Sequence, residues 1–172
     1  FEPVTILVDP SAVDEAKKWL DPQVEILVAQ LDDAWMRDIG PTFVRDSSGK
    51  LVGVNWIFNG WGAQPWATWN KDEKIAELIS GLIGVPNLKS TLINEGGGIH
   101  VDGAGHVLLT ETVQLGEGRN AGLTKQAVET EIHAKLGTTQ AIWLKRGLTR
   151  DYDEFGTRGH VDIVACFAPG GK

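Results

Sequence analysis

The chain lacks the features that mark extracellular, membrane and nucleic-acid-binding proteins. Cys166 is its single cysteine, so an intramolecular disulfide is excluded and a reducing compartment, the cytoplasm, is expected. No apolar run reaches the roughly 20 residues that span a bilayer, so no membrane partner is expected. The 23 acidic and 16 basic residues give a net charge of −7, which argues against nucleic acid as a partner.

The 172 residues also lack a linker or a low-complexity segment, so one domain is expected, and 42% hydrophobic residues are enough for a core. Strand and helix patterns alternate along the chain. Strands are predicted at 4–8, 24–29, 41–45, 51–58, 88–94, 99–101, 106–110, 140–144 and 161–167, and helices at 11–20, after an Asn70 N-cap, and at 124–136. This order predicts an α/β fold with mixed sheets, built from repeated strand–helix units.

Three polar clusters are set among these strands, at 32–38, 95–102 and 159–162. Each places carboxylates beside glycine near a strand end, where side chains can converge on one pocket. Two or three carboxylates with one histidine suit a cationic, planar substrate that gains or loses protons. A guanidinium fits this description because it is permanently charged and its N–H donors match carboxylates in pairs. The clusters therefore predict a small cationic guanidine as the ligand.

The spacing inside the clusters adds detail. Glu95 opens a triple-glycine run, in which the missing Cβ atoms permit a close approach. His160 and Asp162 lie two apart on a predicted strand, so they are expected to share one face. A histidine has the intrinsic pKa, about 6.5, to act first as an acid and then as a base. His100 and Asp102 alternate in the same way, but two potential ligands fall short of a metal site, and no metal is expected.

Four motifs together resemble the agmatine deiminase and bacterial-type peptidylarginine deiminase family: DAWMRDIGPTF at 33–43, FNGWG at 58–62, EGGGIHVD at 95–102 and GHVD at 159–162. They follow that family's order with similar spacing. The resemblance implies a pentein-type α/β propeller of five blades, of which this chain would supply about three. It also implies that residues 1–172 are a partial deiminase catalytic domain, without its opening segment and without the C-terminal third that carries the nucleophilic cysteine.

The resemblance assigns the chemistry to four side chains. It implies that Asp38 and Asp162 bind the guanidinium, that His160 protonates the departing ammonia, and that Glu95 holds His160, the substrate or both. We expect all four to border one polar depression. Asp38 and Asp162 should be more enclosed than Asp72 or Glu117, because a dry site strengthens their hold on a cation.

The pocket walls and the substrate tail involve other residues. Trp35 and Trp61 are expected to pack against the cation or its aliphatic stem. Family members carry an acidic segment before the GHVD motif, near the substrate tail, and the matching stretch differs here. Asp153 or Glu154 is therefore expected to bind the agmatine amine, and Arg158 is the candidate partner for a substrate that carries a carboxylate.

Cys166 lies in an apolar run on the last predicted strand. An apolar setting raises the pKa of a thiol, and the family's nucleophile follows a different, glycine-rich segment. We therefore expect Cys166 to be a buried core residue and not the nucleophile.

Three functions stay open at this point. The first is hydrolysis of agmatine to N-carbamoylputrescine and ammonia, a reaction of putrescine and polyamine synthesis, through a covalent thiouronium-type intermediate and without a cofactor. The second is the same chemistry on C-terminal peptidylarginine or another guanidine. The third is a non-catalytic guanidine-binding module, since the nucleophile is missing. The chain alone is expected to be inactive and to expose apolar surface near Phe1 and Phe167, which favours self-association or pairing with the missing C-terminal part.

Overall fold

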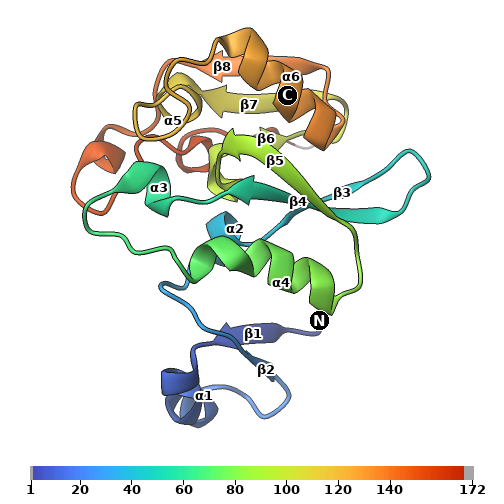
Figure 1. Ribbon diagram of the computed structural model, residues 1–172, viewed down its shortest axis with the longest axis vertical. Helices are drawn as coiled ribbons and strands as arrows, with labels where there is room; N and C mark the ends of the chain where they lie inside the picture. Colours follow the sequence, from blue (N-terminus) through green and yellow to red (C-terminus); the bar gives the residue numbers. More distant parts are fainter. Residues whose placement is uncertain (1, 169–172) are drawn as a thin grey trace.

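A computed structural model describes residues 2–168, whose strands form three separate sheets. The sheets follow one another along the long axis of the molecule (Figure 1). The strands are β1 (Thr5–Val8), β2 (Glu25–Val28), β3 (Thr42–Arg45), β4 (Leu51–Ile57), β5 (Asn87–Ile93), β6 (His100–Val101), β7 (His106–Thr110) and β8 (Gln140–Leu144). The α-helices are α1 (Val13–Trp19), α2 (Met36–Ile39), α3 (Gly60–Ala63), α4 (Ile75–Leu82), α5 (Glu111–Gln114) and α6 (Lys125–Leu136). Short 3₁₀ turns are η1 (Pro10–Ala12), η2 (Asp72–Lys74), η3 (Gly96–Gly98), η4 (Thr149–Tyr152) and η5 (Val161–Ile163).

One strand arrangement occurs twice. In the sheets β3-β4-β5 and β6-β7-β8, the first strand runs antiparallel to the second, and the second runs parallel to the third. Each parallel pair is joined by a helical crossover, through α4 in one sheet and through α6 in the other. The remaining sheet holds the parallel pair β1 and β2, joined through α1. The predicted α/β fold with repeated units is confirmed.

The main hydrophobic core joins the last two sheets to α6. Its buried members are Val54, Trp56, Leu92, Ile99, Val107, Leu109, Val128 and Ile132. Val128 and Ile132 lie four residues apart, so they share the inward face of α6. Thr124 caps this helix by accepting a hydrogen bond from the Ala127 N–H at 3.2 Å, and Gly137 closes it with a left-handed φ of 69°. The predicted helix at 124–136 is therefore confirmed at both ends.

A reciprocal pair of carboxylates fixes the entrance to α4 and the loop before α2. Asp32 accepts the backbone N–H of Lys71 at 2.7 Å, while Asp72 accepts those of Asp32 and Asp33 at 2.8 and 3.0 Å. The predicted Asn70 cap is wrong, because Asp32, which is distant in sequence, takes its place. This exchange ties the loop that leads into α2 to the turn η2 that precedes α4.

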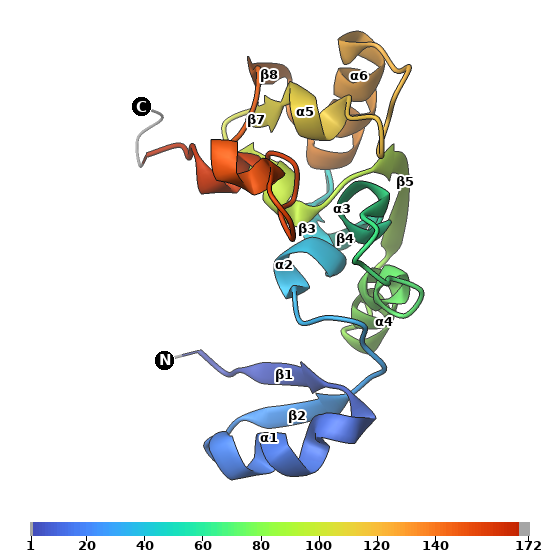
Figure 2. The ribbon, with the colours of Figure 1, turned by 90° about the vertical axis from the view of Figure 1, so that its left-hand side faces the viewer.

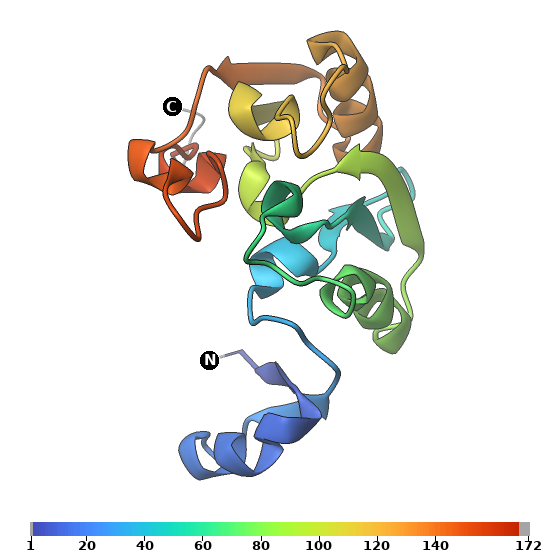
Figure 3. The same cartoon turned by 60° about the vertical axis from the view of Figure 1, so that its left-hand side comes forward.

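The C-terminal segment also differs from the prediction. Instead of a strand at 161–167, the chain forms the turn η5 and then irregular backbone, because no described strand runs beside it to supply hydrogen bonds. The turn η5 lies against η3, and η3 also contacts α2. Figures 2 and 3 show the segment after β8, drawn orange to red, on the side of the molecule away from α4 and α6. Short helical turns from three parts of the sequence thus meet on one side.

Cys166 is exposed, so the prediction of a buried core cysteine is wrong. The reason is the missing strand, which would have turned this side chain into a sheet face. Val4, Ile163 and Val164 expose 54%, 46% and 41% of their surface, as expected for apolar surface near the chain ends, while Phe1 lies outside the described residues. Within residues 2–168, no helix combines the length and the apolar character needed to cross a membrane.

Candidate active site

Asp38, Glu95 and His160 form one buried cluster. His160 Nε2 lies 3.2 Å from Glu95 Oε2, and His160 Nδ1 lies 3.9 Å from Asp38 Oδ1. Their exposed fractions are 8% for Asp38, none for Glu95 and 3% for His160. Each comes from a different segment, namely the helix α2, the residue before η3 and the residue before η5. The structure therefore brings three of the four predicted polar residues into direct proximity.

Asp38 is fixed by two donors and by a glycine. Trp61 Nε1 donates to Oδ2 at 2.9 Å, and the Gly97 N–H donates to Oδ1 at 3.0 Å. A Cβ on Gly97 would collide with His160 Nδ1 and lie 2.9 Å from Asp38 Oδ1, so this glycine is needed for close approach. Burial raises the pKa of Asp38, although His160 and Trp61 favour its ionised form. A bound cation would favour that form further.

Glu95 is paired with a residue that the sequence analysis missed, Arg119. Arg119 Nε lies 3.0 and 3.1 Å from the two carboxylate oxygens of Glu95, and Nη2 lies 3.0 Å from Oε2. Burial opposes the charge on Glu95, but Arg119 and His160 together hold the pKa of this carboxyl below its ordinary value. The sequence around Arg119 resembles a solvent-facing turn, and its glycines were the one sign that this loop could pack closely against another segment. A Cβ on Gly118 would collide with the Gly62 carbonyl oxygen, so the two loops pack closely.

His160 receives its orientation from the same cluster. An ionised carboxylate can only accept, so His160 Nε2 carries a proton and donates a hydrogen bond to Glu95. Burial opposes the imidazolium form, but the hydrogen bond and charge of Glu95, with the charge of Asp38, raise the pKa of His160 above its ordinary value. On the backbone side, the Asp151 carboxylate accepts the N–H groups of Gly159 and His160. The ring is thereby held with Nδ1 toward Asp38.

A pocket of about 680 Å³ opens beside this cluster, and Asp38, His160 and Asp162 line it. Asp162 is exposed on η5, so it borders the pocket from the rim, and the predicted strand face shared with His160 does not exist. Asp38 is more enclosed than Glu117, but the expectation that both aspartates are more enclosed than Asp72 is wrong. Asp72 is fully buried because it caps a loop.

Aromatic side chains form another wall of the same pocket. Trp35 lines it with 58% of its surface exposed, while Trp61 is 3% exposed. Trp61 stacks on Trp66 with ring centroids 5.3 Å apart, and Phe155 meets Trp66 edge-on at 5.5 Å. Sequence reasoning missed Trp66 and Phe155, since neither lies in a polar motif. Carboxylates at one end and aromatic rings along a wall suit a cation carried on an apolar stem.

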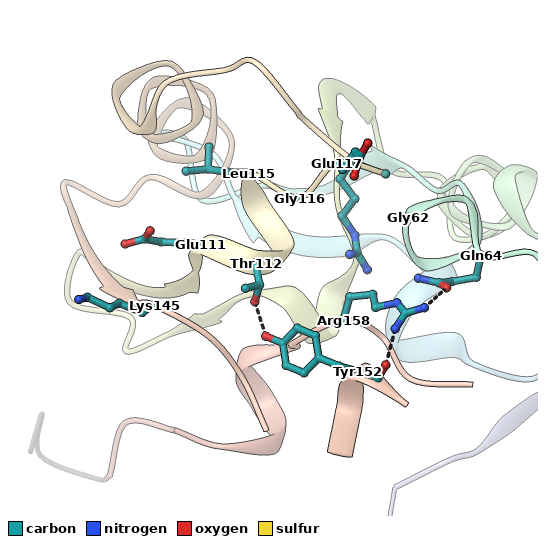
Figure 4. Close-up of a pocket in the computed structure, with 12 residues that line it drawn as sticks. Gly62, Gln64, Glu111, Thr112, Leu115, Gly116, Glu117, Lys145, Tyr152 and Arg158 are labelled. Carbon is teal, nitrogen blue, oxygen red and sulfur yellow. Dashed lines mark hydrogen bonds between the residues drawn. The ribbon is translucent and has the colours of Figure 1, made fainter. Parts of the chain in front are cut away.

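The predicted tail-binding residues lie elsewhere. Asp153 and Glu154 are exposed and are not among the residues that line this pocket. Arg158 turns into an adjacent pocket, where its guanidinium donates to Gln64 Oε1 at 2.8 Å and to the Tyr152 carbonyl oxygen (Figure 4). The acidic stretch therefore contributes its neighbouring aromatic side chain to the wall and not its carboxylates.

His100 and Asp102 serve local structure. Asp102 accepts the backbone N–H groups of Ala104 and His106 and lies 2.6 Å from His106 Nδ1, and these hydrogen bonds lower the pKa of Asp102 to about 2. His100 Nδ1 accepts the Phe167 N–H at 3.4 Å. The part of the chain that the structure describes contains no group of three or more His, Cys, Asp or Glu residues placed to hold a metal ion.

The fold and the site together define an α/β protein of repeated units with a buried cluster of carboxylates and a histidine beside a pocket, and three comparisons give its family. Residues 1–172 match the model of the Porphyromonas-type peptidyl-arginine deiminases. The "Putative agmatine deiminase" of Streptomyces coelicolor is 60% identical over 168 residues, which cover 98% of this chain and 50% of that protein. The chain belongs to the Porphyromonas-type peptidyl-arginine deiminase family.

Solved structures agree with this assignment. The agmatine deiminase of Enterococcus faecalis superimposes with a TM-score of 0.91 at 36% identity, over 99% of this chain and 47% of that one. A cysteine-to-serine variant of the Campylobacter jejuni agmatine deiminase with substrate bound gives a TM-score of 0.83 at 27% identity, over 97% of this chain and 48% of that one. The chain thus spans about half the length of the relatives it matches.

Proposed function

We propose that this chain supplies the guanidinium-binding and acid–base part of an enzyme that hydrolyses agmatine to N-carbamoylputrescine and ammonia. The observation that carries the proposal is the buried cluster of Asp38, Glu95 and His160 at one end of an aromatic-walled pocket. The relatives named agmatine deiminase support the choice of substrate. In this proposal the chain contributes about three blades of a five-bladed ring, and another chain segment completes it.

Binding is assigned to the two aspartates of the pocket. The permanently charged guanidinium would lie between Asp38 and the exposed Asp162, with its aliphatic stem along Trp61 and Trp35. The gap of 3.9 Å between Asp38 Oδ1 and His160 Nδ1 is too long for a direct hydrogen bond. A guanidinium nitrogen placed at this gap would meet both the carboxylate and the group that protonates it.

The reaction proceeds in two halves. A cysteine thiolate attacks the guanidinium carbon, a C–S bond forms, and the C–N bond breaks as the leaving nitrogen takes a proton and departs as ammonia. Water then attacks the same carbon and gives one proton to the imidazole, and the C–S bond breaks to release the thiolate and the urea product. The other proton of the water is taken up by the released ammonia. His160 is the group that gives a proton to the leaving nitrogen and takes one from the attacking water, and Glu95 holds it in place. No cofactor enters this scheme.

The nucleophilic cysteine is assigned to a segment outside these 172 residues. Cys166 is exposed and is not among the residues that line the pocket of Asp38 and His160. The Campylobacter jejuni enzyme was captured with substrate as a cysteine-to-serine variant, which supports a cysteine role in that relative. The completing segment would also cover the exposed side of Asp162.

Peptidylarginine is the second candidate substrate, favoured by the description of the family model. It would bring a carboxylate, for which Arg158 was the candidate partner. Because the Arg158 guanidinium already donates to Gln64 and to the Tyr152 carbonyl, agmatine fits the described residues better. A non-catalytic guanidine-binding module is the third candidate, and it differs from the first two only in turnover.

The test is ammonia release from agmatine, with mass-spectrometric detection of the product. We expect no turnover from the 172-residue chain, and turnover when the C-terminal remainder of the protein is supplied in trans. His160→Asn should abolish the restored activity, while Cys166→Ala should retain it. Turnover by the chain alone would contradict the assignment of the nucleophile. No turnover from the completed protein would favour the binding module, and peptidylarginine turnover without agmatine turnover would favour the second candidate.

A further inference from the structure

Arg119 lies behind the cluster and not in it. Its side chain is 2% exposed, and the Glu95 side chain that it grips is fully buried. It is not among the residues that line the aromatic pocket, so the substrate proposed above would not touch it. An arginine fork on both oxygens of a carboxylate fixes the plane and position of that carboxylate more strictly than a point charge would.

Separate segments hold the guanidinium of Arg119. Nη2 donates to the Thr157 carbonyl oxygen at 2.8 Å, which links it to the loop that carries His160. Asn59 Nδ2 donates to the Gly118 carbonyl oxygen at 2.8 Å, and a Cβ on Gly62 would lie 3.3 Å from Nη1. The FNGWG motif therefore shapes the seat of Arg119 as well as placing Trp61 on Asp38. Arg119 also lines the pocket of Figure 4, in which the Tyr152 hydroxyl donates a hydrogen bond to the Thr112 hydroxyl.

Several charges surround the imidazole of His160. The carboxylates of Glu95 and Asp38 favour the imidazolium, and the guanidinium of Arg119 opposes it. Asp151 contacts the backbone N–H of His160, and Asp162 lies two residues further on. A buried carboxylate with no cation of its own would be stabilised chiefly by the imidazolium, so it would bind that proton tightly. With a permanent cation on its other side, the carboxylate stays charged whether or not the imidazole is protonated.

We propose that Arg119 is a positioning residue that holds Glu95 ionised and aligned on His160 Nε2, and that it offsets enough of the charge of Glu95 for His160 to release its proton. Its catalytic meaning rests on the proposed function, because the acid must become a base between the two halves of the reaction. The proton that leaves His160 passes to the departing ammonia, one proton of the attacking water restores the imidazolium, and the other water proton is taken up by the released ammonia. Glu95 and Arg119 keep their protonation states throughout.

The experiment is an NMR titration of the His160 ring in the 172-residue chain, which needs neither substrate nor turnover. The chain has 4 histidines, and the signal lost in a His160→Gln variant assigns the ring. We expect Arg119→Met to raise the midpoint of the His160 titration by about one pH unit or more. Arg119→Lys keeps the charge and should stay close to the wild-type midpoint. Arg150→Met removes an exposed arginine and should leave the midpoint unchanged.

An unchanged or lowered midpoint in folded Arg119→Met would overturn the proposal and leave Arg119 a purely structural role. If that variant does not fold, the double variant Glu95→Gln, Arg119→Met removes both charges. Its His160 midpoint should then lie above that of the single variant Glu95→Gln, because the guanidinium that opposes the imidazolium is gone, and a midpoint at or below that of Glu95→Gln would overturn the proposal. In the completed enzyme, Arg119→Met should shift the pH profile of turnover toward higher pH. The absence of any turnover by the completed enzyme with Arg119 intact would contradict the proposed function and would leave the titration result unaffected.

Discussion

The inner and outer parts of the site differ in how completely this chain builds them. In the inner part, Glu95 and His160 are buried, hydrogen-bonded to each other and held by further contacts. In the outer part, Asp162 and Trp35 border the same pocket but are exposed to solvent. The side chains that control the protonation of His160 are therefore held in place by contacts within these 172 residues. The groups that would enclose a substrate are open, so their hold on a cation is that of an exposed ion pair, about 1 kcal/mol or less.

The largest effect is expected where the inner part loses a charge. Glu95→Ala leaves the buried Arg119 without its carboxylate, so the free energy of unfolding should fall by about 3–5 kcal/mol. The exposed Glu117→Ala is the matched control and should change it by no more than about 0.5 kcal/mol. Urea unfolding followed by tryptophan fluorescence measures both. Equal small effects would show that the inner part is no more tightly built than the surface.

The second effect concerns the close approach at η3. Gly97→Ala places a methyl group against His160 Nδ1 and Asp38 Oδ1, and we expect a loss of about 1–3 kcal/mol in the free energy of unfolding. Gly81→Ala in α4 meets no atom within 4 Å, so it should stabilise the protein by up to about 1 kcal/mol. Changes of the same sign in the two variants would contradict the packing described for Gly97.

The third effect is a pH dependence of ligand binding. Because burial raises the pKa of Asp38 above 3.8, this carboxyl takes up a proton at a higher pH than an exposed aspartate does. Agmatine affinity, which needs the ionised form, should therefore begin to fall before the pH reaches 3.8. Asp38→Asn should bind more weakly and lose this part of the dependence. Binding followed by calorimetry across the acidic range tests it, and an affinity independent of pH in the wild type would contradict the role of Asp38.

The free energy of unfolding should fall at both acidic and alkaline pH, because Glu95 and His160 have pKa values shifted in opposite directions. The folded state lowers the pKa of Glu95, so ionised Glu95 stabilises the fold above its ordinary pKa. This stabilisation is lost as the pH falls through the lowered pKa. His160 has a raised pKa, so its contribution is present below 6.5 and is lost as the pH rises through the raised one. Urea unfolding at a series of pH values should thus show a maximum that Arg119→Lys retains. A His160→Gln variant that still loses stability on the alkaline side by the same amount would contradict this assignment.

The smallest effect is expected at Cys166. Because its side chain is exposed, Cys166→Ala should change the free energy of unfolding by no more than about 0.5 kcal/mol. The thiol should also react with a labelling reagent in the folded chain, without denaturant. A thiol that reacts only after unfolding would show that it is covered, as the sequence first indicated.

The sequence predicted those elements whose pattern is local. The helix at 124–136 carries its own cap, its apolar face and its terminal glycine, so it could be placed at both ends. The strand expected at 161–167 failed because an apolar run becomes a strand only beside another strand. The turn before α4 is capped by Asp32 and not by Asn70. This cap is likewise a contact between segments distant in sequence, which residue spacing cannot reveal.

The site followed the same rule. Asp38, Glu95 and His160 stand in motifs and could be named, but Arg119 lies in a loop whose composition is typical of a surface turn. Its burial depends on the packing of two loops through Gly62 and Gly118, and no single-residue pattern encodes that approach.

The most direct test of the account uses the indole signal of Trp61, whose Nε1–H donates to Asp38 at 2.9 Å. In a ¹⁵N-correlated NMR spectrum of the chain, agmatine at millimolar concentration should shift this signal, while the exposed Trp19 should not move. N-carbamoylputrescine lacks the guanidinium charge and should shift the Trp61 signal much less. Equal shifts with both compounds, or a shift confined to Trp19, would contradict a guanidinium site at Asp38.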